Sequence, residues 1–205
     1  MSDDLPVSRV FRLFAALFEY PETDPIDAVT ECVELLPVIS VEAANKMDGF
    51  GDFILQASLG RLQEAYTNAF DLQPVSYPYM GYQLFGESYK RGSFMVGLKE
   101  KYREHGFPDT RELPDHLAIL LRFLAVLEEK GERKENYTLV DECLVPSLEK
   151  MAPAFDDKGN PYGDVIDSLL ATVKGVERDN GTRTVTAGDS TTGLQSMASA
   201  AYEEE

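Results

Sequence analysis

The sequence predicts an all-α fold, and three observations support this prediction. Over most of the 205 residues, apolar side chains recur at intervals of three and four, the spacing that places them on one face of a helix. Prolines and glycines separate these segments, as expected where helices begin and end. No segment alternates convincingly between apolar and polar residues, as a strand with one buried face would. With 43% hydrophobic residues and no internal repeat, the chain is expected to form a single compact domain.

Three helices are predicted in the N-terminal part of the chain. The apolar spacing of residues 8–20 predicts the first helix, and Pro21 ends it. Asp24 can cap a second helix, because its side chain can accept a hydrogen bond from a free backbone N–H, and Pro25 suits the first helical position. Ser40 is expected to cap a short third helix.

A longer fourth helix is predicted over residues 52–70, which carry a stripe of phenylalanine, leucine and tyrosine side chains. Residues 73–82 contain two prolines and are expected to form a loop or a broken turn. A fifth helix is predicted over residues 88–105, and Gly106 suits the left-handed conformation that commonly follows a helix end.

Two more helices follow. Pro114 is expected to open the first, because proline is preorganised for an initial turn, and Gly131 is expected to end it. The second is predicted over residues 137–151, with a kink at Pro146, where the backbone lacks an N–H and the ring crowds the preceding turn.

The last predicted helix begins with Asn160 as its cap and Pro161 at its first position, and it ends near Lys174. After it, the composition changes to glycine, threonine, serine and alanine, with too few large apolar residues to offset the entropy lost on ordering. We therefore predict an all-helical domain over residues 1–177 and a flexible polar tail over residues 178–205.

The charge of the chain restricts its partners. Thirty-six acidic and nineteen basic residues give a formal net charge of −17, which repels nucleic acid and anionic lipid and favours basic partners. This acidity is compatible both with simple solubility and with a site for a basic peptide. The N-terminal sequence lacks the features of a secretory signal, and no apolar run reaches membrane-spanning length. We expect a cytoplasmic protein without stable membrane insertion.

Neither the cysteines nor the histidines form a metal-binding pattern. Cys32 and Cys143 are far apart, and each lies among apolar residues of a predicted helix, where cysteine usually packs as a small hydrophobic side chain. His105 and His116 are the two histidines, so ligation of zinc or an iron–sulfur cluster by the chain itself has little support. The sequence contains no serine nucleophile elbow and no glycine-rich phosphate loop. We expect no catalytic residues, no metal, no cofactor and no enzyme activity.

An ordered run of aromatic, glycine and acidic residues occupies the middle of the chain, and no metal, nucleotide or nucleophile pattern explains it. Its members are Tyr66, Phe70-Asp71-Leu72, Phe85-Gly86-Glu87-Ser88, Arg91-Gly92, Tyr102, Gly106, Glu112-Leu113-Pro114-Asp115-His116-Leu117 and Phe123-Leu124-Ala125. The run resembles the TorD/DmsD/NarJ family of chaperones that help molybdenum-containing respiratory enzymes to mature. It resembles most closely the NarJ branch, the assembly chaperones of nitrate reductase.

The resemblance implies a compact fold of about seven to nine helices and a chaperone function. It implies that the chain binds the N-terminal segment of the catalytic subunit of a molybdenum-cofactor oxidoreductase of the nitrate reductase type, and holds that subunit for cofactor insertion and assembly. Alternatively, the client is an exported molybdoenzyme of the DMSO reductase family with a twin-arginine signal peptide, or the chain is a helical scaffold subunit of the finished complex. We expect a monomer or a homodimer.

Several residues of the run allow both a structural and a binding interpretation. Phe70 continues the apolar stripe of its helix and is expected in the core. Asp71 lies at the helix end, where the dipole disfavours a carboxylate unless it caps a turn or pairs with a cation. A cluster of aromatic and methionine side chains can either cover the core or present a surface to an apolar peptide. This cluster consists of Tyr77, Tyr79, Met80, Tyr82 and Phe85.

Glu112, Pro114, Asp115 and His116 surround a predicted helix start. Pro114 and Asp115 suit a first helical turn, which is the structural interpretation. The resemblance implies instead that the cluster borders a peptide-binding groove, where Glu112 and Asp115 would face basic groups of the client. His116 is expected either to titrate near neutral pH or to be buried against the backbone.

The resemblance also implies an internal ion pair for Arg91, with Glu87 or Asp115 as its partner. Together, these interpretations give one set of predicted client-binding residues. The set is Phe70, Asp71, Tyr82, Phe85, Glu87, Arg91, Glu112, Pro114, Asp115 and His116.

Overall fold

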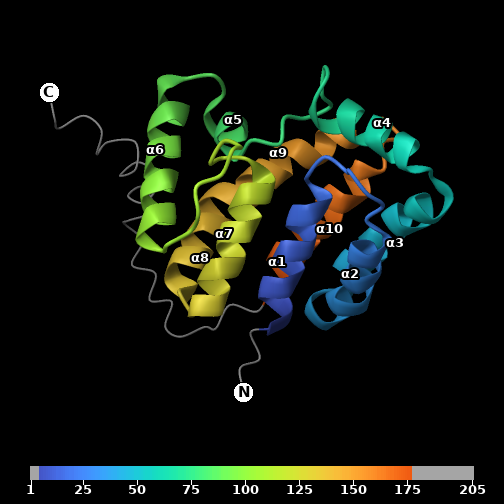
Figure 1. Ribbon diagram of the computed structural model, residues 1–205, viewed down its shortest axis with the longest axis horizontal. Coiled ribbons are helices and arrows are strands. Elements are labelled where there is room, and N and C mark those ends of the chain that lie inside the picture. The colour runs from blue at the N-terminus through green and yellow to red at the C-terminus, as the bar shows by residue number, and fades with distance from the viewer. Residues whose placement is uncertain (1–4, 177–205) are drawn as a thin grey trace, which may run out of the picture.

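The computed structural model describes residues 5–176 and confirms the predicted all-α fold (Figure 1). Helices α8 and α9 are joined without a break by a π-helical turn, so the described residues form nine continuous helices, as predicted. No strand occurs within this range, and a single β-bridge joins Tyr79 to His116. The elements are α1 (Leu5–Leu17), α2 (Ile26–Ile39), α3 (Val41–Gln56), α4 (Leu59–Phe70), α5 (Met80–Phe85), α6 (Tyr89–Glu104), α7 (Leu117–Lys130), α8 (Arg133–Leu139), the π-helical turn (Val140–Leu144), α9 (Val145–Phe155) and α10 (Tyr162–Gly175).

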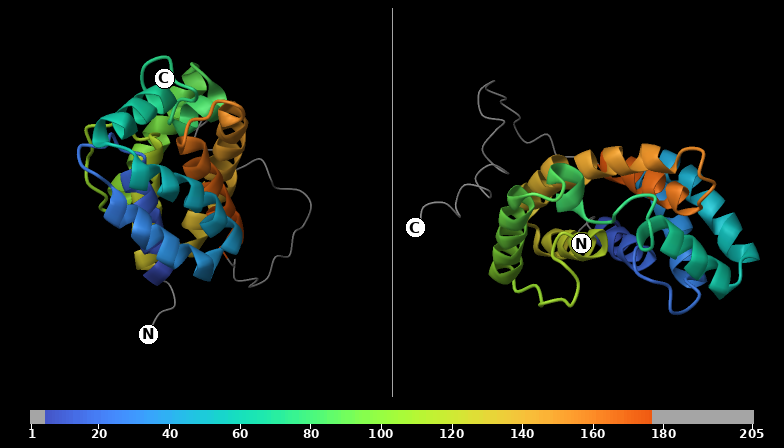
Figure 2. Two further views of the ribbon diagram at one scale, coloured as in Figure 1. Left: turned by 90° about the vertical axis from the view of Figure 1, so that its right-hand side faces the viewer. Right: turned by 90° about the horizontal axis from the view of Figure 1, so that it is seen from above.

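The helices form two layers, one containing α7, α1 and α2 and the other containing α9, α10 and α3 (Figure 2). Helix α6 stands at one end of the layers (Figure 1). Buried aromatic side chains fill the space between the elements, because amphipathic helices exclude water from their apolar faces. The largest fully buried side chains include Phe11, Phe14, Phe18, Phe50, Phe94, Phe123 and Tyr162.

Helices α1 and α7 run antiparallel, which places the end of α1 beside the start of α7. Two ion pairs show this register: Arg12 pairs with Glu129 at 2.8 Å, and Glu19, just after α1, pairs with Arg122 at 2.6 Å. Because of this arrangement, residues about one hundred positions apart in the sequence lie next to each other at one end of the molecule.

The prediction of one helix over residues 52–70 is wrong, and so is the prediction that the helix capped by Ser40 is short. Helix α3 extends to Gln56, and α4 begins at Leu59. The backbone of Ala57 and Ser58 is extended, and the Ser58 hydroxyl accepts a hydrogen bond from the N–H of Arg61 at 3.4 Å. Ser58 therefore starts a new helix at a point where the apolar spacing alone suggests continuity.

The prediction that Pro114 opens a helix is also wrong. Helix α7 begins at Leu117, because the backbone of Asp115 and Leu117 is held by residues 78–80 at the start of α5. The N–H of Met80 donates to the carbonyl of Asp115 at 2.7 Å, and the N–H of Leu117 donates to the carbonyl of Pro78 at 2.8 Å. The predicted loop over residues 73–82 is shorter than expected, because α5 begins at Met80.

Other local predictions are confirmed. The Asp24 carboxylate accepts from the N–H of Ile26 at 3.0 Å, and the Asn160 side chain accepts from the N–H of Tyr162 at 3.0 Å, so each satisfies a free N–H at the start of the helix that follows. Pro25 and Pro161, however, occupy the N-cap positions rather than the predicted first helical positions. Gly106 and Gly131 have φ angles of 64° and 71°, in the left-handed region that favours glycine after a helix.

The predicted kink at Pro146 takes the form of the π-helical turn that precedes it. The N–H of Val145 donates to the carbonyl of Val140, five residues back, so the helix widens by one residue before reaching a proline that has no N–H. The continuous helix runs from Arg133 to Phe155 and is longer at both ends than the predicted 137–151.

Both cysteines, Cys32 and Cys143, are buried and free, as the sequence suggests. Burial raises the pKa of the Cys32 thiol to about 12. The predicted tail over 178–205, and with it the C-terminal boundary of the predicted domain, lies outside the described residues.

Within residues 5–176, no helix is long and apolar enough to cross a membrane.

Candidate functional site

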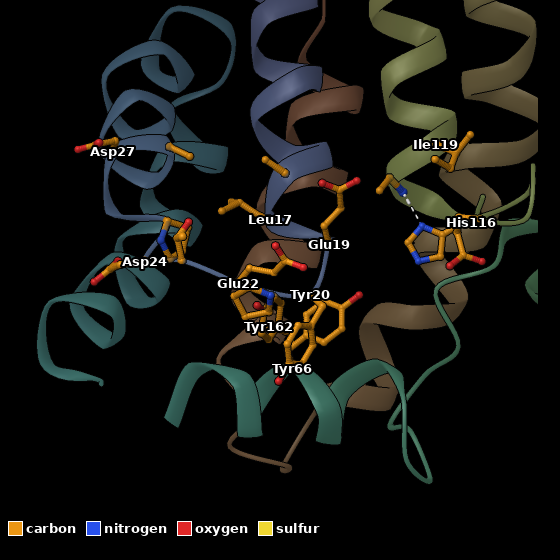
Figure 3. A pocket seen from close by; sticks show the side chains of 17 residues that line it. Leu17, Glu19, Tyr20, Glu22, Asp24, Asp27, Tyr66, His116, Ile119 and Tyr162 are labelled. Carbon is orange, nitrogen blue, oxygen red and sulfur yellow. Dashed lines mark hydrogen bonds between the residues drawn. The ribbon is translucent and has the colours of Figure 1, made fainter. Parts of the chain in front are cut away.

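A cleft of about 760 Å³ opens at the end of the molecule where α1 ends and α7 begins (Figure 3). The loop between α1 and α2 forms one wall, and the residues before and within the first turn of α7 form the opposite wall. Helices α4 and α10 each contribute a tyrosine, Tyr66 and Tyr162. The cleft therefore depends on segments that are distant in sequence and brought together by the antiparallel packing of α1 and α7.

The floor of the cleft is apolar and aromatic. Leu17 from α1 and Ile119 from α7 line the cleft and are almost fully buried. The Tyr66 ring packs edge-on against Tyr162 at 5.6 Å and against Tyr20 at 5.6 Å, and its hydroxyl donates to the carbonyl of Phe18 at 3.1 Å. Burial raises the pKa of Tyr66 well above its usual value, so the phenol remains a hydrogen-bond donor at neutral pH.

The rim of the cleft is acidic, since five carboxylates and no lysine or arginine line it. Three of the carboxylates already have partners within the described chain. Glu19 pairs with Arg122, Asp24 caps α2, and Glu112 accepts from the Tyr79 hydroxyl at 3.2 Å and from a backbone N–H at 2.8 Å.

The other two carboxylates belong to Glu22 and Asp27, which are exposed on the wall formed by the loop and the start of α2. Neither has an ion pair or side-chain hydrogen bond within residues 5–176. An incoming cation can therefore reach two unpaired carboxylates there without displacing an internal partner.

His116 lies on the opposite wall and caps α7. Its Nδ1 accepts the N–H of Ala118 at 3.2 Å, and its ring packs edge-on against Tyr79 at 5.2 Å. The side chain is 6% exposed, and burial lowers the pKa of His116 although Glu112 and Asp115 oppose the effect. The neutral ring with an accepting Nδ1 carries its proton on Nε2, which faces the cleft in Figure 3.

Asp115 is fully buried and forms an ion pair with Arg91, from Nε to Oδ2 at 2.8 Å. The Arg91 guanidinium also lies over the rings of Tyr79 and Tyr82, at 5.2 and 5.8 Å from their centroids. This arrangement confirms the internal ion pair implied for Arg91, with Asp115 as the partner. Because Asp115 is enclosed, it does not reach the surface of the cleft in this structure.

The predicted site residues fall into three groups. Glu112 and His116 line the cleft, while Arg91, Asp115 and Tyr82 form a neighbouring cluster that contacts the cleft through Tyr79. The remaining five lie elsewhere: Phe70 packs in the core against Tyr162, Asp71 and Glu87 are exposed, Phe85 packs on Phe94, and the carbonyl of Pro114 accepts the Tyr102 hydroxyl at 2.7 Å.

Three residues of the cleft, Tyr20 and Glu22 in the loop and Asp27 in the first turn of α2, are absent from the predicted set. A signal for them exists in the sequence, because residues 19–27 contain four acidic residues, two prolines and a tyrosine. An acidic segment of this composition creates a local negative potential that attracts cations. Among the described residues, no group of three histidine, cysteine or acidic side chains is arranged to hold a metal ion.

Comparison with known proteins identifies the family. The sequence model described as nitrate reductase delta subunit matches residues 39–165, more than half of the 205 residues. A Bacillus subtilis (strain 168) protein, "Probable nitrate reductase molybdenum cofactor assembly chaperone NarJ", is 26% identical over 168 residues, covering 81% of this chain and 89% of that protein. The Escherichia coli (strain K12) nitrate reductase molybdenum cofactor assembly chaperone NarJ is 33% identical over 109 residues, covering 53% of this chain and 44% of that longer protein.

A solved structure shares the fold. An Archaeoglobus fulgidus protein described as a redox enzyme maturation protein superposes with a TM-score of 0.55 at 21% identity, covering 82% of this chain and 93% of that one. The segment matched by the family model runs from the end of α2 into the first turn of α10 and includes Glu112 and His116. The chain therefore belongs to the nitrate reductase delta subunit family.

Proposed function

We propose that this chain is a cytoplasmic assembly chaperone for the catalytic subunit of a molybdenum-cofactor enzyme of the nitrate reductase type, and that it has no catalytic activity of its own. The observation that carries the proposal is the family match over residues 39–165. Relatives from Bacillus subtilis and Escherichia coli are named as nitrate reductase molybdenum cofactor assembly chaperones, which supports the same role here.

The cleft is the proposed site for the client. Its acidic rim suits a basic segment, and the exposed ring of Tyr20 offers aromatic surface to the aliphatic parts of such a segment. A disordered client segment that folds into the cleft as a helix would lose conformational entropy, which limits its affinity and makes release possible. Once the client has folded around its cofactor, the segment would no longer be accessible and the chaperone would dissociate.

Affinity purification of the tagged chain from anaerobically grown native cells, followed by mass spectrometry, tests the proposal. We expect recovery of an immature molybdoenzyme catalytic subunit that lacks its cofactor. A matched bait that carries Glu22→Gln and Asp27→Asn should recover less of it. Repeated recovery of the chain alone, under several electron acceptors, would contradict the chaperone function.

The identity of the recovered protein also distinguishes the alternatives. A client with a twin-arginine signal peptide would assign the chain to an exported enzyme. Stoichiometric presence in the purified, active complex would instead identify the chain as a permanent scaffold subunit and would contradict a chaperone that is released.

A further inference from the structure

The two walls of the cleft offer different chemistry to a bound peptide. The loop wall carries Glu22 and Asp27, whose carboxylates have no partner within the described residues. The α7 wall carries Glu112, whose carboxylate already accepts hydrogen bonds from Tyr79 and Leu113, and His116, which is 6% exposed and has no hydrogen-bond partner for Nε2 within residues 5–176. Figure 3 shows Asp27 on one side of the cleft, His116 and Ile119 on the other, and Leu17 and Tyr20 between them. The loop wall thus presents carboxylates without a partner, and the α7 wall presents an unpaired neutral donor beside a carboxylate that already accepts two hydrogen bonds.

A helix has the opposite asymmetry along its own axis. Its first turn has free N–H groups and partial positive charge, and its last turn has free carbonyls and partial negative charge. Basic side chains in the first turn add to the attraction toward the carboxylates, and the Nε2–H of His116 can donate to a carbonyl of the last turn. The first and the last turn of a bound helix therefore favour the same orientation in the cleft, with the first turn toward the carboxylates and the last turn toward His116.

We propose that the cleft binds a helical client segment in one direction, with a basic amino-terminal turn against Glu22 and Asp27 and the carboxy-terminal carbonyls at His116. This inference rests on the proposed chaperone function and adds the chemistry and the polarity of its ligand. The acidic wall lies at residues 22–27, outside the segment of residues 39–165 that the family model matches. The polarity therefore follows from this chain's own residues.

Two synthetic peptides of about 15 residues, long enough to form an isolated helix, test the polarity. They have the same composition, and both are acetylated and amidated at the termini. One carries its lysines in the first two turns and its leucines after them, and the other has the reverse order. Calorimetry with the full chain should show that the amino-terminally basic peptide binds with an about tenfold lower dissociation constant. This difference is expected because several exposed charge contacts each contribute a small favourable free energy.

Matched variants assign the effect to the cleft. Glu22→Gln/Asp27→Asn should remove most of the difference between the peptides, whereas Glu34→Gln/Asp48→Asn should preserve it. The control pair removes the same net charge from exposed positions of α2 and α3 that do not line the cleft. His116→Asn keeps an acceptor that can cap α7, but its side-chain N–H reaches less far into the cleft than Nε2–H of His116. This substitution should therefore weaken binding of the amino-terminally basic peptide more than binding of the reversed peptide.

Equal binding of the two peptides, or equal effects of the cleft pair and the control pair, would overturn the polarity. If neither peptide binds although the tagged chain recovers an immature catalytic subunit from cells, the polarity fails and the chaperone function stands. If the peptides do not bind and no client is recovered, the proposed function fails as well.

Discussion

Gly81 lies where α5 approaches the Arg91–Asp115 ion pair most closely. A Cβ at this position would lie 2.8 Å from Asp115 Oδ2 and about as close to side-chain atoms of Arg91 and Phe94. Gly81→Ala should therefore destabilise the protein by about 1–3 kcal/mol through overpacking, despite the better helix propensity of alanine. Urea unfolding monitored by circular dichroism measures the change.

Gly92→Ala is the matched control for Gly81→Ala. Gly92 lies within α6, and a Cβ built there meets no atom within 4 Å. This substitution should stabilise the protein by about 0.5–1 kcal/mol, because alanine loses less backbone entropy in a helix. Equal effects of the two substitutions would contradict the close approach of α5 to the ion pair.

Asp115 has the structural role that the sequence left open beside a binding role. Asp115→Asn leaves the Arg91 guanidinium, 17% exposed, without its carboxylate and should cost about 3 kcal/mol of unfolding free energy. The cost should be smaller in an Arg91→Gln background, because the unpaired cation is then absent. Glu87→Gln, at an exposed position nearby, should change the urea midpoint little. An unchanged midpoint for Asp115→Asn would show that the pair contributes no stability.

His116 makes stability depend on pH near neutrality. Its folded-state pKa is lowered, mainly by burial, so the unfolded chain binds a proton at a pH where the folded chain does not. Stability contributed by the neutral ring is present above about pH 6.5 and is lost as the pH falls through the folded pKa. His116→Asn keeps an acceptor for the Ala118 N–H but does not titrate. Urea midpoints at pH 7.5 and 5.5 should differ less in this variant than in the natural chain, and an equal difference would exclude His116 as the source.

Among the elements, α4 contributes Tyr66 to the floor of the cleft and follows the break at Ser58. Ser58→Ala removes the side chain that accepts the Arg61 N–H and should cost about 1 kcal/mol. Ser58→Asp should retain the cap and add a favourable interaction with the helix dipole. Hydrogen exchange of the α4 amides should accelerate in Ser58→Ala and not in Ser58→Asp. Unchanged exchange in Ser58→Ala would show that tertiary contacts alone hold α4 in place.

The elements also show how far sequence reasoning reaches. Helix caps such as Asp24 and Asn160 were predictable because capping involves neighbouring residues. The start of α7 was not, because it depends on hydrogen bonds between residues 115–117 and 78–80, which only the tertiary fold brings together. The break between α3 and α4 was missed because the apolar spacing continues across it and Ser58 is the one local sign of a new helix.

The same limit applies to the candidate site. Glu112 and His116 were found because they belong to one contiguous sequence cluster. Their partners across the cleft, Glu22 and Asp27, lie about ninety residues earlier and meet them through the antiparallel packing of α1 and α7. For Asp115, the sequence left a structural role and a place at the groove both open, because its burial depends on Arg91 and α5, which only the tertiary fold brings to it.

At the scale of the whole molecule, the formal net charge of −17 should accelerate the encounter with a basic client. Long-range attraction acts on association and is screened by salt, because the Debye length falls from about 30 Å at 0.01 M to about 3 Å at 1 M. The association rate constant of the amino-terminally basic peptide should therefore fall at least about tenfold between 0.01 M and 0.5 M salt.

The variants separate this whole-molecule field from the local contacts in the cleft. Glu22→Gln/Asp27→Asn and Glu34→Gln/Asp48→Asn each reduce the net charge equally, so both should slow association to a similar, small extent. Only the cleft pair should accelerate dissociation, because only those carboxylates contact the bound peptide. Stopped-flow fluorescence with a labelled peptide measures both rate constants. A salt-independent association rate would show that the acidity of the chain does not guide its client, and equal dissociation rates in the two double variants would place the bound peptide outside the cleft.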